Sequence, residues 1–380
     1  MKDEWEAMPL GELCDVLDHK RKPITKRDRD AGEYPYYGAT GVLDHVAGYL
    51  FDEPLVLVGE DGAKWGSGDN TAFAVEGKVW VNNHAHVLRP NRDKLLDRWL
   101  IYHLNHSDLT AFVSGLTVPK LNQGSLREIP IPVPPLPDQQ RIVALLDDAF
   151  AGLATAKANA ERNLQHARAV FESHLECVFS QRGESWTEQR LGDLSRINYG
   201  YTESASDEKV GPHFLRITDI QENGVDWDSV PYCRIDAKAI PKYKLIDGDI
   251  VFARTGASTG KSYLVTNPPE SVFASYLIRL QVSRKELLPQ FLNLYFQSPL
   301  YWAAVRAGVS GSAQGGFNAS KLGELVIPYP KSSEEQLSVV DHLNELAKET
   351  QHLTQLYERK LAALEELKQS LLQQAFNGEL

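Results

Sequence analysis

Two short motifs carry residues that could support nucleotide chemistry, and each lacks a part that the chemistry requires. The stretch Gly256–Ser262 resembles a phosphate-binding P-loop, but three residues separate its glycines where that loop needs four. Asn267-Pro268-Pro269 is followed by Glu270, whereas the adenine-N6 methyltransferase motif needs an aromatic residue there to stack on a flipped base. No glycine-rich strand–turn–helix segment for a methyl donor is evident either. We therefore expect both segments to be loops without catalytic function.

Metal and nucleophile chemistry are equally weakly supported. His84-x-His86 and His103-x-x-His106 have the spacing of ligand pairs, but neither has a cysteine or carboxylate at ligand spacing nearby. The three cysteines are far apart and form no Cys-x-x-Cys pair, which argues against structural zinc and disulfides. No Ser/His/Asp arrangement stands out. The sequence predicts neither a metal site nor a catalytic centre.

What remains is a set of loops rich in lysine, arginine, asparagine, glutamine, serine and tyrosine, the residues that contact phosphates and read base edges. The densest is His19–Arg27, close to Tyr34, Tyr36 and Tyr37. The chain contains an internal repeat, described below, and the stretch that corresponds to this loop in the second copy, Asn198–Glu203, is not basic. Two domains that share a scaffold but differ in their loops would suit two different targets.

An internal repeat supplies that shared scaffold. Trp5 and Leu10-Gly11-Glu12-Leu13 recur as Trp186 and Leu191-Gly192-Asp193-Leu194 at one constant offset. Further along, Val113–Pro134 recurs as Val309–Pro330, with Gln140 matched to Gln336, at a larger offset. The repeated unit is far longer than the 20–50 residues of a solenoid repeat, so each copy is a domain.

Each copy is expected to be mixed α/β. Short apolar runs bounded by turn residues predict strands, and longer runs with apolar residues on one face predict helices. The expected strands are Pro54–Gly59, Lys78–Asn83, Asp249–Ala253 and Val272–Val282, and the expected helices are Leu95–Leu109 and Pro289–Val305. A proline-rich strip then follows in each copy, Ile129–Pro135 and Val326–Pro330, and is expected to be a stiff connector.

A long amphipathic helix follows each strip. Each is about 40 residues, hence roughly 60 Å at 1.5 Å per residue. The apolar stripe is alanine-rich in one helix and leucine-rich in the other, which favours an antiparallel pair. The residues predicted to pack in this pair or against other subunits are Leu145, Leu153, Leu164, Phe171, Leu346, Leu353, Leu361, Leu364 and Leu371.

Composition sets the broad class. The 380 residues are 42% hydrophobic and 24% charged, as in soluble globular proteins. Neither a secretory signal nor a membrane-spanning run is evident, so we expect a cytoplasmic protein. The net charge is −11, but the acidity lies in the first copy and the helices, whereas residues 181–330 carry equal numbers of acidic and basic side chains. DNA binding requires a local basic surface and not a basic total, so it stays open.

The chain resembles the specificity subunit of Type I restriction–modification enzymes over essentially its full length. The resemblance rests on the order of five segments, together with the duplication and the two helices. These segments are Tyr34–Gly41, Asn82–His86, Ile129–Pro132 leading into Leu136–Ile142, Arg254–Ala257 and Leu372–Leu380.

The resemblance implies an α+β architecture with two tandem target-recognition domains and two long antiparallel coiled-coil helices, related by an internal pseudo-two-fold repeat. The expected limits are 1–137 and 181–331 for the domains, and 138–180 and 332–380 for the helical regions. Each domain would read half of an asymmetric, bipartite DNA site, and the coiled coil would set the spacer and dock two methyltransferase subunits. Restriction subunits would join them. S-adenosylmethionine would bind the methyltransferase partner, ATP and magnesium the restriction partner, and no cofactor this chain.

DNA contacts are predicted from the loops near residues 19–29, 60–68, 114–123, 198–206, 254–263 and 309–318. The residues chosen are Lys20, Arg21, Lys22, Lys26, Arg27, Tyr37, Lys64, Lys120, Asn122, Tyr199, Tyr201, Arg254, Lys261, Ser310 and Gln314. Two other functions stay open. One is an adenine methyltransferase with its own site at Asn267-Pro268-Pro269, and the other is a coiled-coil adaptor that binds only proteins.

Overall fold

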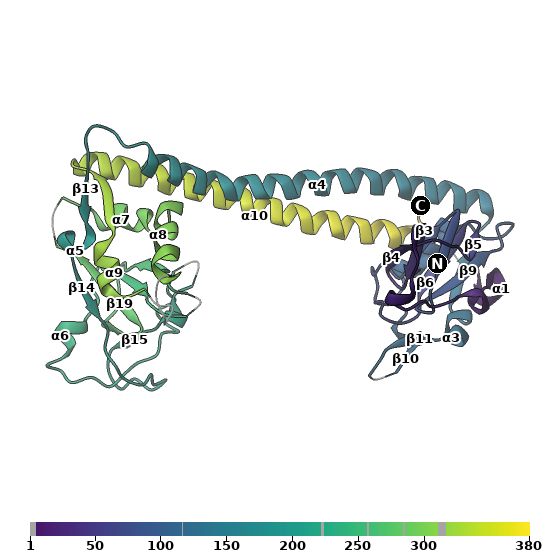
Figure 1. Cartoon of the computed structure of the whole chain (residues 1–380), viewed down its shortest axis with the longest axis horizontal. Helices are drawn as coiled ribbons and strands as arrows, with labels where there is room; N and C mark the ends of the chain where they lie inside the picture. Colours follow the sequence, from purple (N-terminus) through teal and green to yellow (C-terminus); the bar gives the residue numbers. More distant parts are fainter. Residues whose placement is uncertain (1–4, 116, 222–223, 257, 284–285, 311–316) are drawn as a thin grey trace. The chain divides into compact units, whose positions relative to one another are not determined.

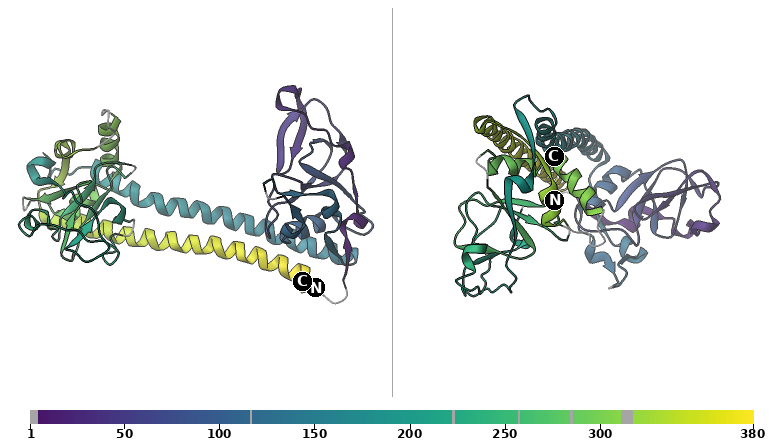
Figure 2. Two further views of the ribbon diagram at one scale, coloured as in Figure 1. Left: turned by 90° about the horizontal axis from the view of Figure 1, so that it is seen from below. Right: turned by 60° about the vertical axis from the view of Figure 1, so that its left-hand side comes forward.

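The chain forms two compact units that share two long helices. The computed structural model describes residues 5–115, 117–221, 224–256, 258–283, 286–310 and 317–380. Unit 1 comprises Met1–Glu161 and Glu358–Leu380, and unit 2 comprises Arg162–Tyr357. Helices α4 (Leu136–Ser180) and α10 (Ser333–Asn377) each contribute one part to each unit. In both units the two helices lie side by side in opposite directions, as the antiparallel pairing predicted (Figures 1 and 2).

The main sheet has the same strand order in both units, and all its neighbouring strands are antiparallel. In unit 1 the order is β2 (Cys14–Val16), β9 (Ala85–Pro90), β6 (Leu55–Gly59) and β7 (Ala72–Val75). In unit 2 it is β14 (Ser195–Tyr199), β19 (Leu277–Val282), β16 (Ile250–Ala253) and β17 (Ser262–Leu264). The repeat seen in the sequence is therefore a repeat of topology.

The register of the central strand repeats as well. In unit 1, Leu88 of β9 lies opposite Val16 of β2 and Val56 of β6. In unit 2, Leu280 of β19 holds the same place between β14 and β16. Strands β6 and β16 are buried at every position, as expected for central strands covered on both faces.

The recurring Leu-Gly-x-Leu segments anchor each core. They form the short helices α1 (Leu10–Leu13) and α5 (Leu191–Leu194), and all four of their leucines are fully buried. Because both ends of this segment point into the core, its spacing is under the same packing constraint in both copies.

Outside the main sheet the two units differ. Unit 1 has a second sheet, in the order β4 (Gly41–Val46), β3 (Ala31–Gly38), β8 (Lys78–Val81) and β5 (Phe51–Asp52), together with α2 (Asp97–His106), the hairpin β10 (Val113–Ser114) and β11 (Lys120–Leu121), and α3 (Gln123–Arg127). Unit 2 has the parallel pair β15 (His213–Leu215) and β18 (Ser271–Phe273), and helices α6 (Ile240–Tyr243), α7 (Pro289–Tyr295), α8 (Pro299–Ser310) and α9 (Ala319–Glu324).

The proline-rich strips are strands and not connectors. Strand β12 (Pro130–Val133) pairs with β1 (Glu6–Pro9), and β20 (Val326–Pro330) pairs with β13 (Trp186–Arg190). Proline is compatible with a two-stranded sheet because each strand has an unpaired side where the missing N–H costs nothing. Each strip thus ties the end of its domain back to the beginning of that domain.

Two expected elements of the second copy are each broken into two. The expected helix at 289–305 is α7 followed by α8, because Pro299 has no N–H to continue the first helix. The expected strand at 272–282 is β18 followed by β19. The turn between these strands ends at Tyr276, whose side chain is 61% exposed.

A buried glutamine joins each domain to its long helix. Gln139 and Gln336 are both fully buried. The Gln139 side-chain oxygen accepts a hydrogen bond from the backbone N–H of Leu96 at 2.9 Å, and that of Gln336 accepts one from Leu288 at 2.8 Å. The amide nitrogens donate to backbone carbonyls on both sides of each junction.

These glutamines correct the alignment of the two copies. The sequence pattern matched Gln140 to Gln336, but Gln140 is exposed and Gln139 makes the equivalent bonds. Gln139 donates to the carbonyl of Pro134 at 2.8 Å, and Gln336 donates to that of Pro330 at 2.7 Å. The second copy therefore has one more residue between the strip and the glutamine.

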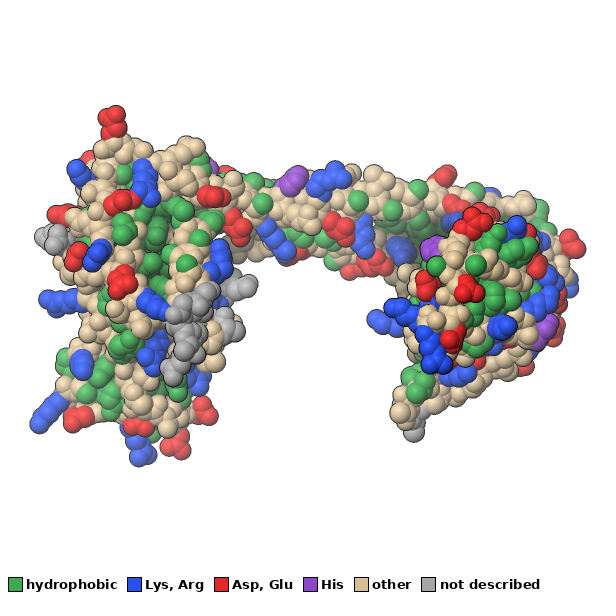
Figure 3. All heavy atoms as spheres, viewed as in Figure 1, with side chains coloured by type: hydrophobic (Ala, Val, Ile, Leu, Met, Phe, Trp, Pro, Cys, Tyr) green, Lys and Arg blue, Asp and Glu red, His purple; other side chains and the backbone are tan. Residues whose placement is uncertain are grey.

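The helix pair follows the predicted stripes except at two leucines. Leu153, Leu164, Phe171, Leu346, Leu361, Leu364 and Leu371 are half-buried. Leu145 is 42% exposed and Leu353 is 40% exposed, whereas the neighbouring Leu146 is fully buried. These two leucines do not pack within the helix pair, so of the two roles predicted for them only contact with other subunits stays a prediction. Basic and acidic side chains are interspersed along the visible face of the pair (Figure 3). Among the described helices none is long and apolar enough to cross a membrane.

Candidate nucleic-acid interface

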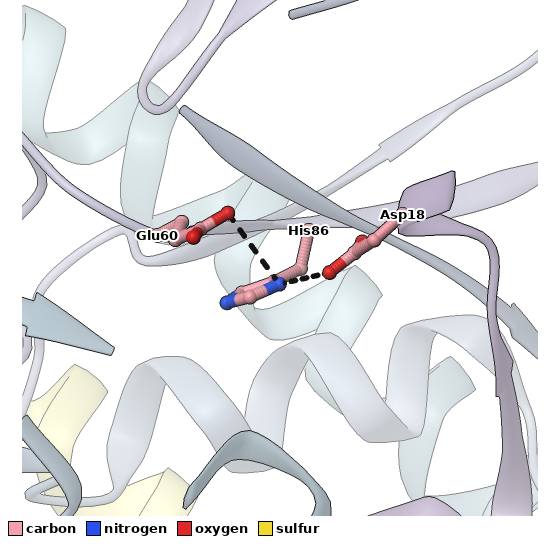
Figure 4. A group of neighbouring side chains, drawn as sticks. All are labelled: Asp18, Glu60 and His86. Carbon is pink, nitrogen blue, oxygen red and sulfur yellow. Dashed lines mark hydrogen bonds and ion pairs between the residues drawn. The ribbon is translucent and has the colours of Figure 1, made fainter. Parts of the chain in front are cut away.

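In unit 1, three strand ends of the main sheet bring ionisable side chains together. Strand β9 runs antiparallel to β2 and β6, so its beginning lies beside the ends of both. Asp18 follows β2, Glu60 follows β6, and His86 is the second residue of β9. The ligand-type atoms of these three side chains all lie within 4.8 Å of one another (Figure 4).

His86 is the centre of this group. The side chain is fully buried, with Nδ1 2.6 Å from Asp18 Oδ2 and Nε2 2.7 Å from the carbonyl oxygen of Leu121. Both neighbouring atoms are oxygens that accept hydrogen bonds, so each ring nitrogen of His86 faces an acceptor. The same His86 Nδ1 lies 3.8 Å from Glu60 Oε2, which places the ring between two carboxyl groups.

Two further cations complete the network. The Arg21 guanidinium pairs with Glu60 and donates to the carbonyl of Ala85 at 2.8 Å. It also lies 3.3 Å from Asp18 Oδ2. Lys120 Nζ lies 2.8 Å from Glu60 Oε1. The network therefore ties the loop after β2, the loop after β6 and the β10–β11 hairpin to one point.

The carboxyl groups gain more from their partners than burial costs them. Burial alone would raise the pKa of Asp18, but hydrogen bonds from His86 and Val87 and the charges of His86 and Arg21 hold that pKa below its ordinary value. Burial also opposes ionisation of Glu60, and hydrogen bonds from Lys120 and Arg21 hold its pKa below the ordinary value. Both carboxylates are thus stabilised in their charged form.

This donor set fits an ion-pair network better than a metal site. Asp, Glu and His are metal ligands, but a metal would have to displace Arg21 and Lys120 from Glu60. The Asp18 oxygens are likewise engaged by the Val87 N–H at 2.9 Å and by His86. We assign the cluster a structural role in holding the loops.

The corresponding edge of unit 2 carries a different group. Arg254 follows β16, and its guanidinium carbon lies 5.0 Å from the centroid of the Tyr199 ring, at the end of β14. The backbone N–H of Arg254 donates to the carbonyl of Tyr276 at 3.3 Å. The Tyr199 hydroxyl accepts a hydrogen bond from the backbone N–H of Ala319 at 3.2 Å. A cation stacked on an exposed aromatic ring thus occupies this edge.

Backbone bonds show that Glu60 and Arg254 are equivalent. The Glu60 carbonyl accepts from the N–H of Leu121 at 2.8 Å, and the Arg254 carbonyl accepts from the N–H of Phe317 at 3.1 Å. In both units the next residue is an asparagine at the N-cap of a short helix, α3 or α9. The two edges therefore share their backbone and differ in their side chains.

A known family has this duplicated arrangement. The family described as Type I restriction modification DNA specificity domain matches the chain twice, over residues 2–162 and 183–365. The chain belongs to this family. It is a specificity subunit of the Type I restriction–modification class with two copies of the specificity domain, as the resemblance predicted.

Several relatives are described as specificity subunits. The putative Type I restriction enzyme specificity subunit S.HindORF215P of Haemophilus influenzae is 39% identical over 144 residues, which are 38% of this chain and 36% of that protein. The EcoKI specificity subunit of Escherichia coli is 26% identical, covering 77% of this chain and 68% of its own. The EcoBI subunit is 24% identical, covering 87% and 74%. These relatives are named specificity subunits and not methyltransferases.

Solved structures share the fold. A chain from a study of complex assembly and conformational transition of the type I R-M system has a TM-score of 0.75 at 19% identity, covering 100% of this chain and 99% of its own. The HsdS subunit from Thermoanaerobacter tengcongensis has a TM-score of 0.60 at 18% identity, covering 100% and 98%. Both folds therefore span this whole chain.

Most basic residues predicted to contact DNA in unit 1 are accessible. Lys20, Lys22, Lys26, Arg27 and Lys64 are exposed, so their contacts with DNA stay a prediction.

Arg21 differs from its basic neighbours in the loop. Only 13% of its side chain is exposed, and its donors are committed to Asp18, Glu60 and Ala85. The sequence suggested a side chain free to contact DNA, whereas in the structure Arg21 ties the loop to the strand ends of the main sheet.

Three other predicted residues of unit 1 have structural contacts. Tyr37 is half-buried, with its ring centroid 5.9 Å from that of Phe73. Lys120 belongs to the ion network, but 40% of its side chain is exposed. Asn122 is exposed and donates to the Ser114 hydroxyl at 2.7 Å. Of the three, Lys120 and Asn122 retain accessible polar groups.

In unit 2, Tyr201 is half-buried, with its ring centroid 5.2 Å from that of Tyr243. Lys261 donates to the carbonyl of Ile220 at 3.3 Å. The Ser310 side chain and Gln314 lie outside the described residues. Tyr199 and Arg254 form the stacked pair, and they are the predicted residues that the structure brings together in this unit.

Sequence reasoning missed the partners of these groups. Asp18 and Glu60 stand apart in the sequence, and only the strand register brings them to His86. The pattern His84-x-His86 pointed to the right residue but not to its surroundings, because His84 precedes β9 and is exposed whereas His86 is fully buried within the strand. Tyr276 was missed because the expected strand ran through it.

Proposed function

We propose that this specificity subunit recognises double-stranded DNA through two domains, each reading one half of an asymmetric, bipartite site. The observation that carries the proposal is the pair of equivalent strand edges, which share a backbone but present an ion network in one unit and an arginine on a tyrosine in the other. Two similar scaffolds with unlike side chains are suited to two unlike half-sites, because base contacts specify a sequence.

The long helices dock the partner subunits in this proposal. After the helices have paired, large apolar side chains stay exposed along them, among them Leu145, Val170, Leu353, Leu356 and Leu367. Exposed apolar groups that gather on one element favour protein contacts. We place two methyltransferase subunits on this surface, with restriction subunits joining them.

The specificity subunit is non-catalytic in this proposal. The methyltransferase subunits bind S-adenosylmethionine, and the restriction subunits bind ATP and magnesium. The loop at Gly256–Ser262 and the Asn-Pro-Pro-Glu segment at Asn267–Glu270 are given no chemistry, because each departs from its motif at a residue that the motif requires.

The test is a methylation map of the source genome, made by sequencing that detects N6-methyladenine, with the gene intact and deleted. We expect one split, asymmetric motif to lose methylation on deletion. Replacing residues 181–331 with the corresponding domain of another specificity subunit should then change one half of the motif. A change in both halves would contradict independent reading by the two domains.

DNA binding is tested on the assembled complex. Proteins that neutralise phosphates lose affinity steeply as salt rises. Retention of the motif duplex at low salt, with a steep loss towards high salt, is the expected result. No retention of the duplex at low salt would favour the adaptor function, in which the chain binds only proteins.

A further inference from the structure

Arg254 differs from the other buried or half-buried arginines of unit 2 in having no acid beside it. Arg216 Nη2 lies 2.8 Å from Asp219 Oδ1, and Arg279 Nη1 lies 3.9 Å from Asp249 Oδ2. Within the part of the chain that the structure describes, Arg254 forms no ion pair. A half-buried charge without an acidic partner is costly, so a ligand that supplies acceptors would stabilise the Arg254 guanidinium.

The Tyr199 ring and the backbone hydrogen bonds of Arg254 restrict where the guanidinium can lie. Its central carbon lies over the Tyr199 ring, 5.0 Å from the ring centroid, and the Tyr199 hydroxyl accepts a hydrogen bond from the backbone N–H of Ala319. The Arg254 backbone is held by hydrogen bonds to Tyr276 and Phe317. Nε is buried and has no hydrogen-bond partner. Among the described residues, no hydrogen bond engages Nη1 or Nη2, which are the donors left for a ligand.

The surroundings are suited to a flat acceptor. The Tyr199 ring, which lies against the guanidinium, is 42% exposed, and Tyr276, whose backbone carbonyl accepts from the Arg254 N–H, is 61% exposed. An arginine held flat by an aromatic ring presents two parallel N–H groups in a fixed plane. Guanine offers the matching pair of acceptors, N7 and O6, in the major groove. A phosphate needs no such fixed plane and is served by flexible exposed lysines.

We propose that Arg254, oriented by Tyr199, reads a guanine in the half-site bound by residues 181–331. This inference rests on the proposed function and adds to it the base and the residue. Arg254 is the specificity-determining residue that contacts the base, and Tyr199 is a positioning residue that acts through it.

The experiment uses the assembled methyltransferase complex with the full chain. The domain exchange first assigns one half-site to residues 181–331. Methylation rates are then compared on duplexes that carry each of the four base pairs at every position of that half. The variants are Arg254→Lys, Tyr199→Ala and Tyr199→Phe. Arg254→Lys keeps the positive charge but loses the two parallel N–H groups of the guanidinium. Arg190→Lys is the matched control, because Arg190 is an exposed arginine on the separate β13–β20 pair.

The expected result is a guanine at one position of this half-site. For Arg254→Lys, preference for guanine at that position should fall roughly tenfold or more, with preferences elsewhere unchanged. Tyr199→Ala should relax the same position, and Tyr199→Phe should retain most of the preference because it keeps the ring. Arg190→Lys should match the wild-type chain.

Three outcomes overturn the assignment. One is a half-site without guanine. Another is an Arg254→Lys chain with unchanged preferences. The third is an equal loss of rate on all duplexes, which indicates a phosphate contact or a folding defect. Thermal unfolding distinguishes those two, and Tyr199→Phe then serves as a folded variant. A wild-type chain without any gene-dependent split motif would instead overturn the proposed function itself.

Discussion

The two main sheets place opposite charges at the same backbone position. In unit 1 the residue after β6 is Glu60, which is neutralised by Arg21 and Lys120. In unit 2 the equivalent residue is Arg254, which rests on Tyr199. The first edge satisfies its polar groups internally, and the second leaves donors open. The comparison shows that the strand core fixes where a side chain stands, while its charge can change without changing the strand order.

A second contrast concerns what burial does to a carboxyl group. Asp18 and Glu60 have lowered pKa values, because hydrogen bonds and cations outweigh burial. Asp249 in unit 2 has a raised pKa, because burial outweighs its hydrogen bonds and the charge of Arg279. The same burial lowers the pKa of Arg279. The unit 1 network therefore stabilises the fold, whereas the unit 2 pair carries an unfavourable desolvation cost.

The largest expected effect comes from removing the acid at the centre of the first edge. Asp18→Ala leaves His86 buried with one acceptor and the Val87 N–H without its partner. We expect unit 1 to lose about 3 kcal/mol or more of its unfolding free energy. Hydrogen exchange of the β9 amides measures this loss unit by unit. The exposed Asp28→Ala, which removes a pair with Arg27, should cost less than about 1 kcal/mol. Equal losses of unfolding free energy in Asp18→Ala and Asp28→Ala would show that the buried ion network does not account for the stability of unit 1.

The next effect tests the helix phase. Leu146→Ala should cost about 2–5 kcal/mol, because Leu146 is fully buried. Leu145→Ala should change the stability of the chain alone by under about 1 kcal/mol. Chemical unfolding of both variants, followed by the fluorescence of Trp99, provides the comparison. If Leu145 proved the more costly residue, the phase seen in the structure would be wrong.

The two junctions should respond alike. Gln139→Ala and Gln336→Ala each leave a buried backbone N–H without its acceptor, at about 1–3 kcal/mol. The adjacent Gln140→Ala is the control, with no measurable effect expected for this exposed residue. Hydrogen exchange at Leu96 and Leu288 reports each junction separately. If only one of the two substitutions lowered stability, the junctions would have the same hydrogen bonds but would contribute differently to the free energy of unfolding.

The smallest effect distinguishes the two kinds of carboxyl group. Because the pKa values of Asp18 and Glu60 are lowered, their stabilisation is present above about pH 4.5 and is lost as the pH falls through the lowered values. The pKa of Asp249 is raised, so its contribution is greatest below the ordinary aspartate value and is lost as the pH rises through the raised value. Asp249→Asn should therefore change stability at pH 7 by less than about 1 kcal/mol. Hydrogen exchange of β16 against pH provides the test, and a loss as large as that of Asp18→Ala would refute the contrast.

The sequence predicted the features that depend on local pattern. The duplication follows from recurring residues at a constant offset, the central strands and both long helices follow from apolar runs and their spacing, and the structure has all of them. It did not predict the cluster of Asp18, Glu60 and His86, because that depends on which strand ends meet. The sequence did not show that Leu146 and not Leu145 packs within the chain, because a shift of one residue moves a side chain by about 100° around a helix. Arg21 was taken as free because a loop sequence does not show what lies beneath it.

The glutamine junctions have a consequence for how such chains diversify. Gln336 reaches only main-chain atoms, namely the N–H of Leu288 and the carbonyls of Glu286 and Pro330, and Gln139 does the same in the other copy. Every amino acid supplies a main-chain carbonyl, and every one except proline supplies an N–H. The glutamine junction therefore does not depend on the side chains of the domain that it contacts. If recombination exchanged the DNA that encodes one domain for that of a related gene, the incoming domain would form the same main-chain hydrogen bonds with the resident glutamine. New target sequences could then arise by recombination in one step, without compensating mutations in the helices.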